Sequence, residues 1–168
     1  RVQGAVEFGG KNSGYFTSAT GVNFFRGDGW HPEDKGIAVI GDVGSNIIHR
    51  KRVQEDGLFV LGQRMDEKSE LVSSSDIWFR PVQYENGPDG AMHVLDMYRE
   101  VIEHPWSLPP EIKQHLDLTS GRDRGRLYRI VATNYQHRAT PRLSQATLAE
   151  LVELLDHPNA WHRESASR

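Results

Sequence analysis

Ionisable side chains gather in one polar stretch in the second half of the chain, just before and within residues 97–125. His104 is the candidate general base, because imidazole changes its charge closest to neutral pH. Guanidinium groups match carboxylates, so the arginines of this stretch are candidates for holding an anionic cofactor; they are Arg80, Arg99, Arg122 and Arg124. Carboxylate oxygens suit calcium, and the candidate metal ligands are Asp96 and Glu103.

Each of these residues also has a structural interpretation. Asp42 and Asp96 each end a short apolar run, where an aspartate commonly accepts hydrogen bonds from the backbone that follows. Arg122 and Arg124 could bind carboxylates of their own segment instead of a ligand. A lone histidine such as His104 is more often structural than catalytic. The residue types therefore leave a binding role and a structural role open.

Several classes of function are excluded by what the sequence lacks. It contains no cysteine, which excludes a disulfide framework, a thiolate nucleophile and a cysteine-ligated metal. The GxGxxG, GxxxxGK[ST] and HExxH motifs are missing, and no complete calcium-loop spacing is present. The net charge of −3 argues against a basic nucleic-acid-binding protein. No apolar run approaches the roughly 20 residues of a membrane span, so neither nucleic acid nor a membrane span is expected.

The size and the two ends of the chain suggest a piece of something longer. A length of 168 residues corresponds to about one domain with an appendage. The first residue is Arg1, and the last residues, HRESASR, are typical of a helix interior. We therefore expect that the chain is part of a longer protein.

An internal repeat organises the first 131 residues. GIAVIGD at 36–42 aligns with GAMHVLD at 90–96, an offset of 54 residues, and each is preceded and followed by a second pair of similar segments. Units of three or four short strands that recur every 40–55 residues or so are typical of β-propeller blades. The pattern predicts two antiparallel β-units near residues 15–65 and 76–132. A chance likeness between two hairpins is the alternative.

The polar stretch is a long insertion within the second unit. It carries Trp106, Leu108, Ile112 and Leu116, so we expect residues 97–125 to be ordered and to pack on one end of the sheets. In a blade, the turn before the inner strand and the loop after the second strand share a face. This topology predicts one shared site on that face, made of Arg80, Asp96, Arg99, His104, Arg122 and Arg124.

The last part of the chain has helical spacing. Leu148, Leu151, Val152 and Leu155 form an apolar stripe, which predicts a helix near residues 145–156 that Ser144 would cap. A second helix is expected near residues 160–168 with Asn159 as its cap. The pair suggests the start of a helical solenoid, and a simple helical hairpin is the alternative.

Two long segments carry a resemblance to a known family: DIWFRPVQ, and the run from PDGAMHVLD through LTSGRDRGRLYRIV. With GYFTSATGVNFFRGDGW, GDVGSNIIHRKRV and LVELLDHPNAWHRESASR, they resemble a bacterial family labelled as membrane-bound dehydrogenases, whose propeller is similar to glucose/sorbosone dehydrogenases. The resemblance implies a mainly β fold. Residues 1–135 would form about two four-stranded antiparallel blades of a six-bladed propeller, residues 136–143 a linker, and residues 144–168 the start of a HEAT-like repeat.

The resemblance implies a function and a location. The chain would be a fragment of a quinoprotein-type dehydrogenase that oxidises a sugar or alcohol, with pyrroloquinoline quinone (PQQ) and calcium as cofactors. Its partners would be the rest of the propeller and a c-type haem domain, whose CxxCH motif is not in this chain, and the location would be the periplasm, cell envelope or exterior. The alternative is a non-catalytic propeller–HEAT scaffold that binds polysaccharide or protein through Trp106, Trp161 and the acidic loop.

Overall fold

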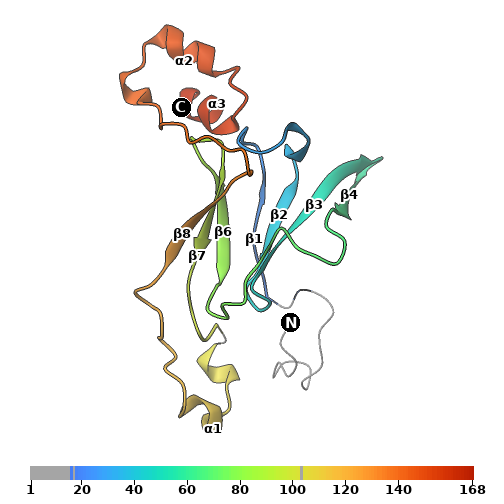
Figure 1. Cartoon of the computed structure of the whole chain (residues 1–168), viewed down its shortest axis with the longest axis vertical. Coiled ribbons are helices and arrows are strands. Elements are labelled where there is room, and N and C mark those ends of the chain that lie inside the picture. The colour runs from blue at the N-terminus through green and yellow to red at the C-terminus, as the bar shows by residue number, and fades with distance from the viewer. Residues whose placement is uncertain (1–15, 17, 103) are drawn as a thin grey trace.

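The computed structural model describes residues 16, 18–102 and 104–168. This part of the chain is mainly β, with two antiparallel sheets side by side and short helices at either end (Figure 1). The two antiparallel units expected near residues 15–65 and 76–132 are confirmed. Within the described residues, neither sheet closes on itself, and no helix is both long enough and apolar enough to cross a membrane.

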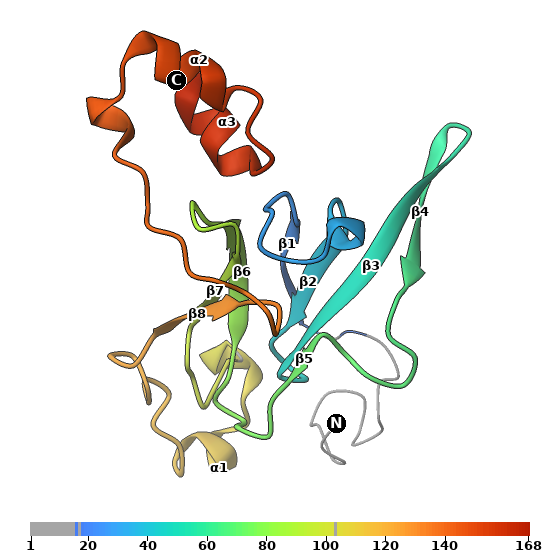
Figure 2. The same ribbon diagram turned by 45° about the horizontal axis from the view of Figure 1, so that its top comes forward.

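The first sheet is a four-stranded meander with a short fifth strand. Its strands are β1 (Ala19–Phe24), β2 (Ala38–Asp42), β3 (Ile47–Asp56), β4 (Phe59–Arg64) and β5 (Val72–Ser73). Strands β1 to β4 pair in chain order, and β5 pairs with the start of β3. Strand β2 is almost wholly buried, because it lies between two strands and Val39 faces the core. The end of β3 and all of β4 form an exposed hairpin that projects from the body (Figure 2).

The second sheet has three strands in the described residues, one fewer than the four expected. They are β6 (Pro81–Asn86), β7 (Met92–Asp96) and β8 (Arg126–Ile130), in that order. After β8 the chain leaves the sheet, because its next residues are held elsewhere. The indole of Trp30 donates to the Ile130 carbonyl at 2.8 Å, and the Tyr135 hydroxyl donates to the Asp89 carbonyl at 3.2 Å.

The sequence repeat corresponds to equivalent strands, since β2 and β7 lie in the aligned segments 36–42 and 90–96 and each is the second strand of its sheet. The aspartate that ends each strand makes the same contacts. Asp42 Oδ1 accepts from the amides of Ser18 and Gly44, and Asp96 Oδ1 accepts from those of Arg80 and Tyr98. Each aspartate thus joins the end of its own strand to the residue just before the first strand of the same sheet.

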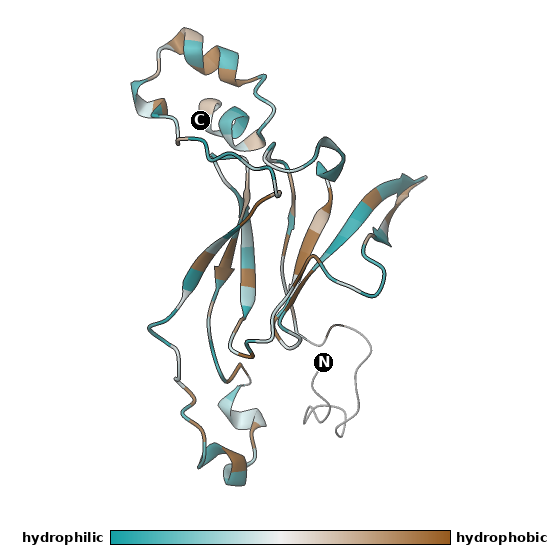
Figure 3. Cartoon of the chain, in the orientation of Figure 1, coloured by the Kyte–Doolittle hydropathy of each residue, from teal (hydrophilic) through white to brown (hydrophobic). Residues whose placement is uncertain are grey.

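The two sheets share one hydrophobic core. The first sheet and its loops contribute Phe25, Ile37, Val39 and Ile48, and the second contributes Phe79, Tyr84, Met92 and Val94. All are nearly inaccessible to solvent, and burying an apolar side chain of this size stabilises a fold by about 1.5–3 kcal/mol. Figure 3 shows hydrophobic segments along the middle strands, whereas the projecting hairpin carries long hydrophilic stretches.

Strands β1 and β6 lie against each other and run in the same direction. Thr20 Oγ1 donates to the Pro81 carbonyl at 2.6 Å, and Asn23 Nδ2 donates to the Tyr84 carbonyl at 2.6 Å. The close approach requires glycine: a Cβ on Gly41 would lie 2.7 Å from the Pro81 carbonyl oxygen and against the Tyr84 hydroxyl. The contact between the sheets therefore excludes a side chain at this position.

Two short helices lie at the end of the sheets opposite α1 (Pro110–Lys113) (Figure 1). They are α2 (Leu148–Leu154) and α3 (Ala160–Ala166), which confirms the two predicted helices. Asn159 caps α3 as expected. The predicted Ser144 cap is wrong: Thr147 caps α2, because Glu150 three residues later completes a capping box. Ser144 lies instead in the 3-10 helix η4 (Leu143–Gln145).

The insertion between β7 and β8 contacts the segment before β6 near both of its ends. The Arg99 amide donates to the Trp78 carbonyl at 3.1 Å, and a Cβ on Gly121 would lie 3.5 Å from the Trp78 ring. The middle of the insertion, with η3 (Pro105–Ser107) and α1, lies beyond the end of the sheets (Figure 1). The expectation that Trp106 packs onto the sheets is wrong in this chain: its side chain is 90% exposed.

The tight turn 87–90 between β6 and β7 joins the second sheet to the segment after β8 and to α3. The buried Asp89 carboxylate accepts from Arg129 at 2.7 Å and from the Ala91 amide at 3.2 Å, and it lies 3.2 Å from His93 Nε2. Burial acts to raise the pKa of Asp89, but these hydrogen bonds outweigh it and lower the pKa to about 2. The ionised carboxylate is therefore a stabilising part of the fold.

The approach of the two sheets can be tested with Gly41→Ala. The added methyl group would meet Pro81 and Tyr84, and we expect the free energy of unfolding to fall by about 1–3 kcal/mol. Gly62→Ala on the exposed hairpin is the matched control, since its Cβ would meet only the flexible Lys51 side chain. Urea unfolding measures both. Equal stability of the two variants would contradict the assigned contact.

The role of Asp89 can be tested with Asp89→Asn at different pH values. The pKa of Asp89 is lowered from 3.8 to about 2, so its contribution of roughly 2 kcal/mol is present above about pH 4 and is lost as the pH falls through 2. The variant should be less stable at pH 7. The difference in unfolding free energy should shrink between pH 4 and 2, and a constant difference would argue against the assignment.

Candidate binding site at the loop end

The end of the second sheet where β6 begins, β7 ends and β8 begins, together with residues 97–125, is called the loop end here. The predicted site residues converge on this end through their contacts. Arg80 contacts the backbone of Arg99 and Glu100, and Arg99 contacts the backbone of Thr119. Among the predicted site residues that the structure describes, only Arg122 and Arg124 line the charged cavity described below, and the side chains of Arg80, Asp96, Arg99 and His104 have partners within the fold.

Arg80 is buried and its guanidinium contacts backbone. Nε donates to the Arg99 carbonyl at 2.8 Å, Nη1 to that of Val43 at 2.6 Å and Nη2 to that of Glu100 at 2.7 Å. The side chain is 8% exposed. Arg80 thus joins the first sheet to the start of the insertion, and its guanidinium does not present a free pair of donors to an anionic ligand.

Asp96 is also engaged on both oxygens. Oδ1 accepts from two backbone amides, those of Arg80 at 2.8 Å and Tyr98 at 2.9 Å. Oδ2 accepts from Arg126 Nε at 2.9 Å and pairs with its Nη2 at 2.8 Å. The Asp96 side chain is wholly buried, so these contacts match the structural interpretation of a strand-end aspartate.

The residues present do not fit a calcium ion at Asp96. A calcium ion takes six to eight oxygen ligands, whereas the Asp96 oxygens are taken by donors that would have to be displaced. Among residues 16, 18–102 and 104–168, no group of three or more His, Asp or Glu side chains could hold a metal ion. Glu103, the other predicted metal ligand, lies outside the described residues.

Arg126 is a central residue of the loop end that sequence reasoning missed. Its guanidinium lies 3.6 Å from the centre of the Tyr98 ring and pairs with Asp96 and, at 3.4 Å, with Asp76. Burial acts to lower the pKa of Arg126, but the hydrogen bond and charge of Asp96 outweigh it and raise the pKa. The long insertion separates Arg126 from its partners, so local spacing gave no signal.

His104 is exposed and caps a short helix. Its Nδ1 accepts from the Trp106 amide at 3.2 Å, at the start of η3. This contact occupies one ring nitrogen with backbone. A proton acceptor for catalysis would have to be the other nitrogen, or His104 would have to leave the cap.

Arg122 and Arg124 are the predicted anion-binding residues that remain exposed. They line a cavity of about 420 Å³ beside the segment that precedes β6. Its other lining residues are Trp78, Asp117, Thr119, Ser120, Gly121 and Asp123. Asp117 shapes this loop, since it accepts from the Thr119 amide and hydroxyl at 2.9 and 2.8 Å. These hydrogen bonds lower the pKa of Asp117. The cavity thus combines an indole ring with two cations and two carboxylates.

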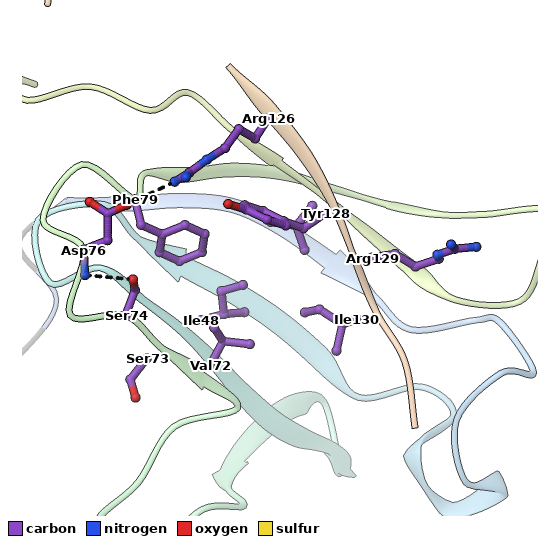
Figure 4. Close-up of a pocket in the computed structure, with 11 residues that line it drawn as sticks. Ile48, Val72, Ser73, Ser74, Asp76, Phe79, Arg126, Tyr128, Arg129 and Ile130 are labelled. Carbon is purple, nitrogen blue, oxygen red and sulfur yellow. Dashed lines mark hydrogen bonds and ion pairs between the residues drawn. The ribbon is translucent and has the colours of Figure 1, made fainter. Parts of the chain in front are cut away.

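A second cavity of about 330 Å³ lies between the sheets. Figure 4 shows Phe79, Tyr128 and Ile48 along its walls, with Asp76 and Arg126 directed toward each other at one end. Arg129 points away from its centre. Its walls are mainly apolar, in contrast to the charged cavity at the loop end.

Two of the residues expected at a cofactor or metal site, Arg80 and Asp96, maintain the backbone at the loop end. Arg122, Arg124 and Trp78 offer guanidinium groups and an aromatic ring to a ligand that reaches the cavity.

Comparison with known proteins gives a family but no function. A family model described as a domain of unknown function (DUF7133) matches residues 2–134, most of the chain. No curated protein and no solved structure matches. The match spans both sheets and the loop end, and the chain therefore belongs to the DUF7133 family.

Proposed function

We propose that this chain is a non-catalytic binding module whose loop end takes polysaccharide, and that its sheets are two successive β-propeller blades followed by the start of a HEAT-like repeat. The observation that carries the proposal is the state of Arg80 and Asp96. Both are buried and hydrogen-bonded within the fold. Two of the residues expected to hold a quinone and a calcium ion are thus used to hold the chain itself.

Three features support the assignment of blades. Strands β1 and β6 are the first strands of their meanders, lie side by side and run in the same direction, as the inner strands of neighbouring blades do. The strand-end aspartates repeat the same contacts at the same offset. The sheets pack face to face around one core. A ring built by repeating this unit would place the loop end on one face.

The surface of α2 supports the assignment of a helical repeat. Leu148, Val152 and Leu155 are 83%, 65% and 48% exposed, so the apolar stripe of α2 lies on the side away from α3. An amphipathic helix of a solenoid buries such a stripe against the next repeat. The stripe is therefore suited to a following pair of helices.

The chemistry of the loop end favours a polysaccharide that carries carboxylates. Trp106 is 90% exposed on the same insertion as the cavity, and an indole offers a flat apolar face with a polar edge to a sugar ring. Arg122 and Arg124 can each bind a carboxylate with two parallel hydrogen bonds. A polymer of acidic sugars offers sugar rings to the indole and carboxylates to the two arginines.

The proposal is tested by calorimetric titration of the chain with acidic and neutral oligosaccharides. We expect binding of the acidic series only. The R122A/R124A variant should bind at least about tenfold more weakly, which corresponds to about 1.4 kcal/mol. Trp106→Ala should weaken binding without changing stability, because the ring is exposed. Arg142→Ala is the matched control, since Arg142 is exposed in the linker before α2, and its affinity should be unchanged.

A dehydrogenase would give a different result. Stoichiometric binding of PQQ that depends on calcium and is lost in R122A/R124A, together with oxidation of a sugar by an artificial dye acceptor, would contradict the proposal. Absence of binding to every acidic oligosaccharide tested, while the fold is intact, would contradict it as well.

A further inference from the structure

Two histidine rings are stacked where α3 meets the sheets. The ring centres of His157 and His162 lie 4.0 Å apart with an angle of 29° between the planes. His157 lies in the turn before α3, and His162 lies within α3 and is 7% exposed. Two charged imidazolium rings would repel at this distance, so the stack requires that at least one ring be neutral.

The hydrogen bonds of both rings specify the neutral form. His157 Nδ1 accepts from the Asn159 amide at 3.0 Å, so that nitrogen carries no proton. His162 Nε2 donates to the Pro88 carbonyl at 2.8 Å. Its Nδ1 is buried and has no hydrogen-bond partner in the described chain. A proton on either Nδ1 would remove the amide contact of His157 or bury an N–H of His162 without an acceptor.

The same two residues hold α3 onto the sheets. Asn159, which the His157 ring helps to position, is completely buried and donates to the Gly87 carbonyl at 2.9 Å. His162 contacts the next residue of that turn, and the Ala160 amide donates to the Arg26 carbonyl at 3.0 Å. Loss of the ring contacts would therefore act directly on the turn 87–90 and on the docking of α3.

We propose that the His157–His162 stack is a pH-sensitive latch, which holds α3 on the turn 87–90 while both rings are neutral and releases α3 when the rings are protonated. Release would separate the helical pair from the sheets and expose the polar backbone of the turn. The latch thus makes the angle between the sheets and the helical pair depend on pH.

The charged groups around the stack do not cancel this response. They are Arg26, Asp28, Lys35, Asp89, His93, Arg129, His137, Arg138, Asp156, Arg163 and Glu164. The partly buried Asp28 and the buried Asp89 already pair with Arg138 and Arg129. His93 Nε2 lies 3.2 Å from Asp89 Oδ1 and so faces a carboxylate.

The direction of the effect follows from His157. Burial, and then the neighbouring His162, lower the pKa of His157 from its ordinary 6.5 in the docked state. The neutral ring therefore favours docking above about pH 6.5, and docking weakens as the pH falls below that value. The pKa of Asp28 is lowered because its hydrogen bond and ion pair with Arg138 outweigh burial. The pKa of Asp89 is also lowered, so both carboxylates stay charged in this range.

The latch can be tested by measuring a distance between two spin labels. The chain contains no cysteine, so E85C on β6 and S167C at the end of α3 provide the only labelling sites. We expect one short distance at pH 7.5 and a second, longer population at pH 5.5. The shift in the pKa of His157 makes the docking constant fall by up to about tenfold per pH unit below about pH 6.5.

A double variant separates the latch from general acid effects. H157N keeps an oxygen acceptor for the Asn159 amide, and H162Q keeps an N–H donor for Pro88, but neither side chain titrates. H157N/H162Q should stay docked at pH 5.5. His115→Gln is the matched control, because His115 is exposed in the insertion, and it should behave as the parent chain does. Equal release in H157N/H162Q and in the parent would overturn the proposal.

Imidazole NMR of the unmodified parent gives a test that does not depend on any variant. Both rings should be neutral with the proton on Nε2 at pH 7.5, and their protonation should coincide with the change in label distance. Protonation of both rings while α3 remains docked would also overturn the proposal, as would an unchanged distance from pH 7.5 to 5.5.

Discussion

The contact between Arg80 and Asp96 is the interaction on which the arrangement of the sheets depends. Asp96 fixes the end of β7 to the start of β6 and to Arg126 of β8, which sets the register of all three strands. The Arg80 guanidinium then reaches the Val43 carbonyl of the first sheet and the first turn of the insertion. A guanidinium can contact several carbonyls at once because its N–H donors point in different directions within one rigid plane. The Arg80 guanidinium and the Asp96 carboxylate are both buried. Neither charge would be stable there without the hydrogen bonds that it makes.

The two ends of the second sheet differ in chemistry. At the loop end, the buried charges of Arg80 and Asp96 are used internally, whereas Arg122, Arg124 and the Trp106 ring are exposed. At the opposite end, the turn 87–90 collects contacts from the linker and α3 through Asp89, Arg138 and His162. We propose that the loop end serves recognition and that the other end controls how the helical part is attached. The sheets connect the two ends as one packed body.

Much of the fold was predictable because its signals are local. The segments around β2 and β7 show their equivalence in sequence, and the Asn159 cap needs only the residues that follow it. The partners of Arg80 were not predictable, since they are carbonyls 37, 19 and 20 residues away and a carbonyl has no sequence signature. Arg126 was missed for the same reason. Trp106 was expected to pack because it is apolar, but apolar type alone does not say which surface covers a ring.

We propose that Arg80 holds the fold and does not bind a cofactor. Urea unfolding of Arg80→Lys tests it most directly, because lysine keeps the charge and loses the divergent donors. The account predicts that the free energy of unfolding falls by about 2–4 kcal/mol, since several buried carbonyls lose their partners. Unchanged stability, combined with loss of binding of an anionic ligand, would contradict it.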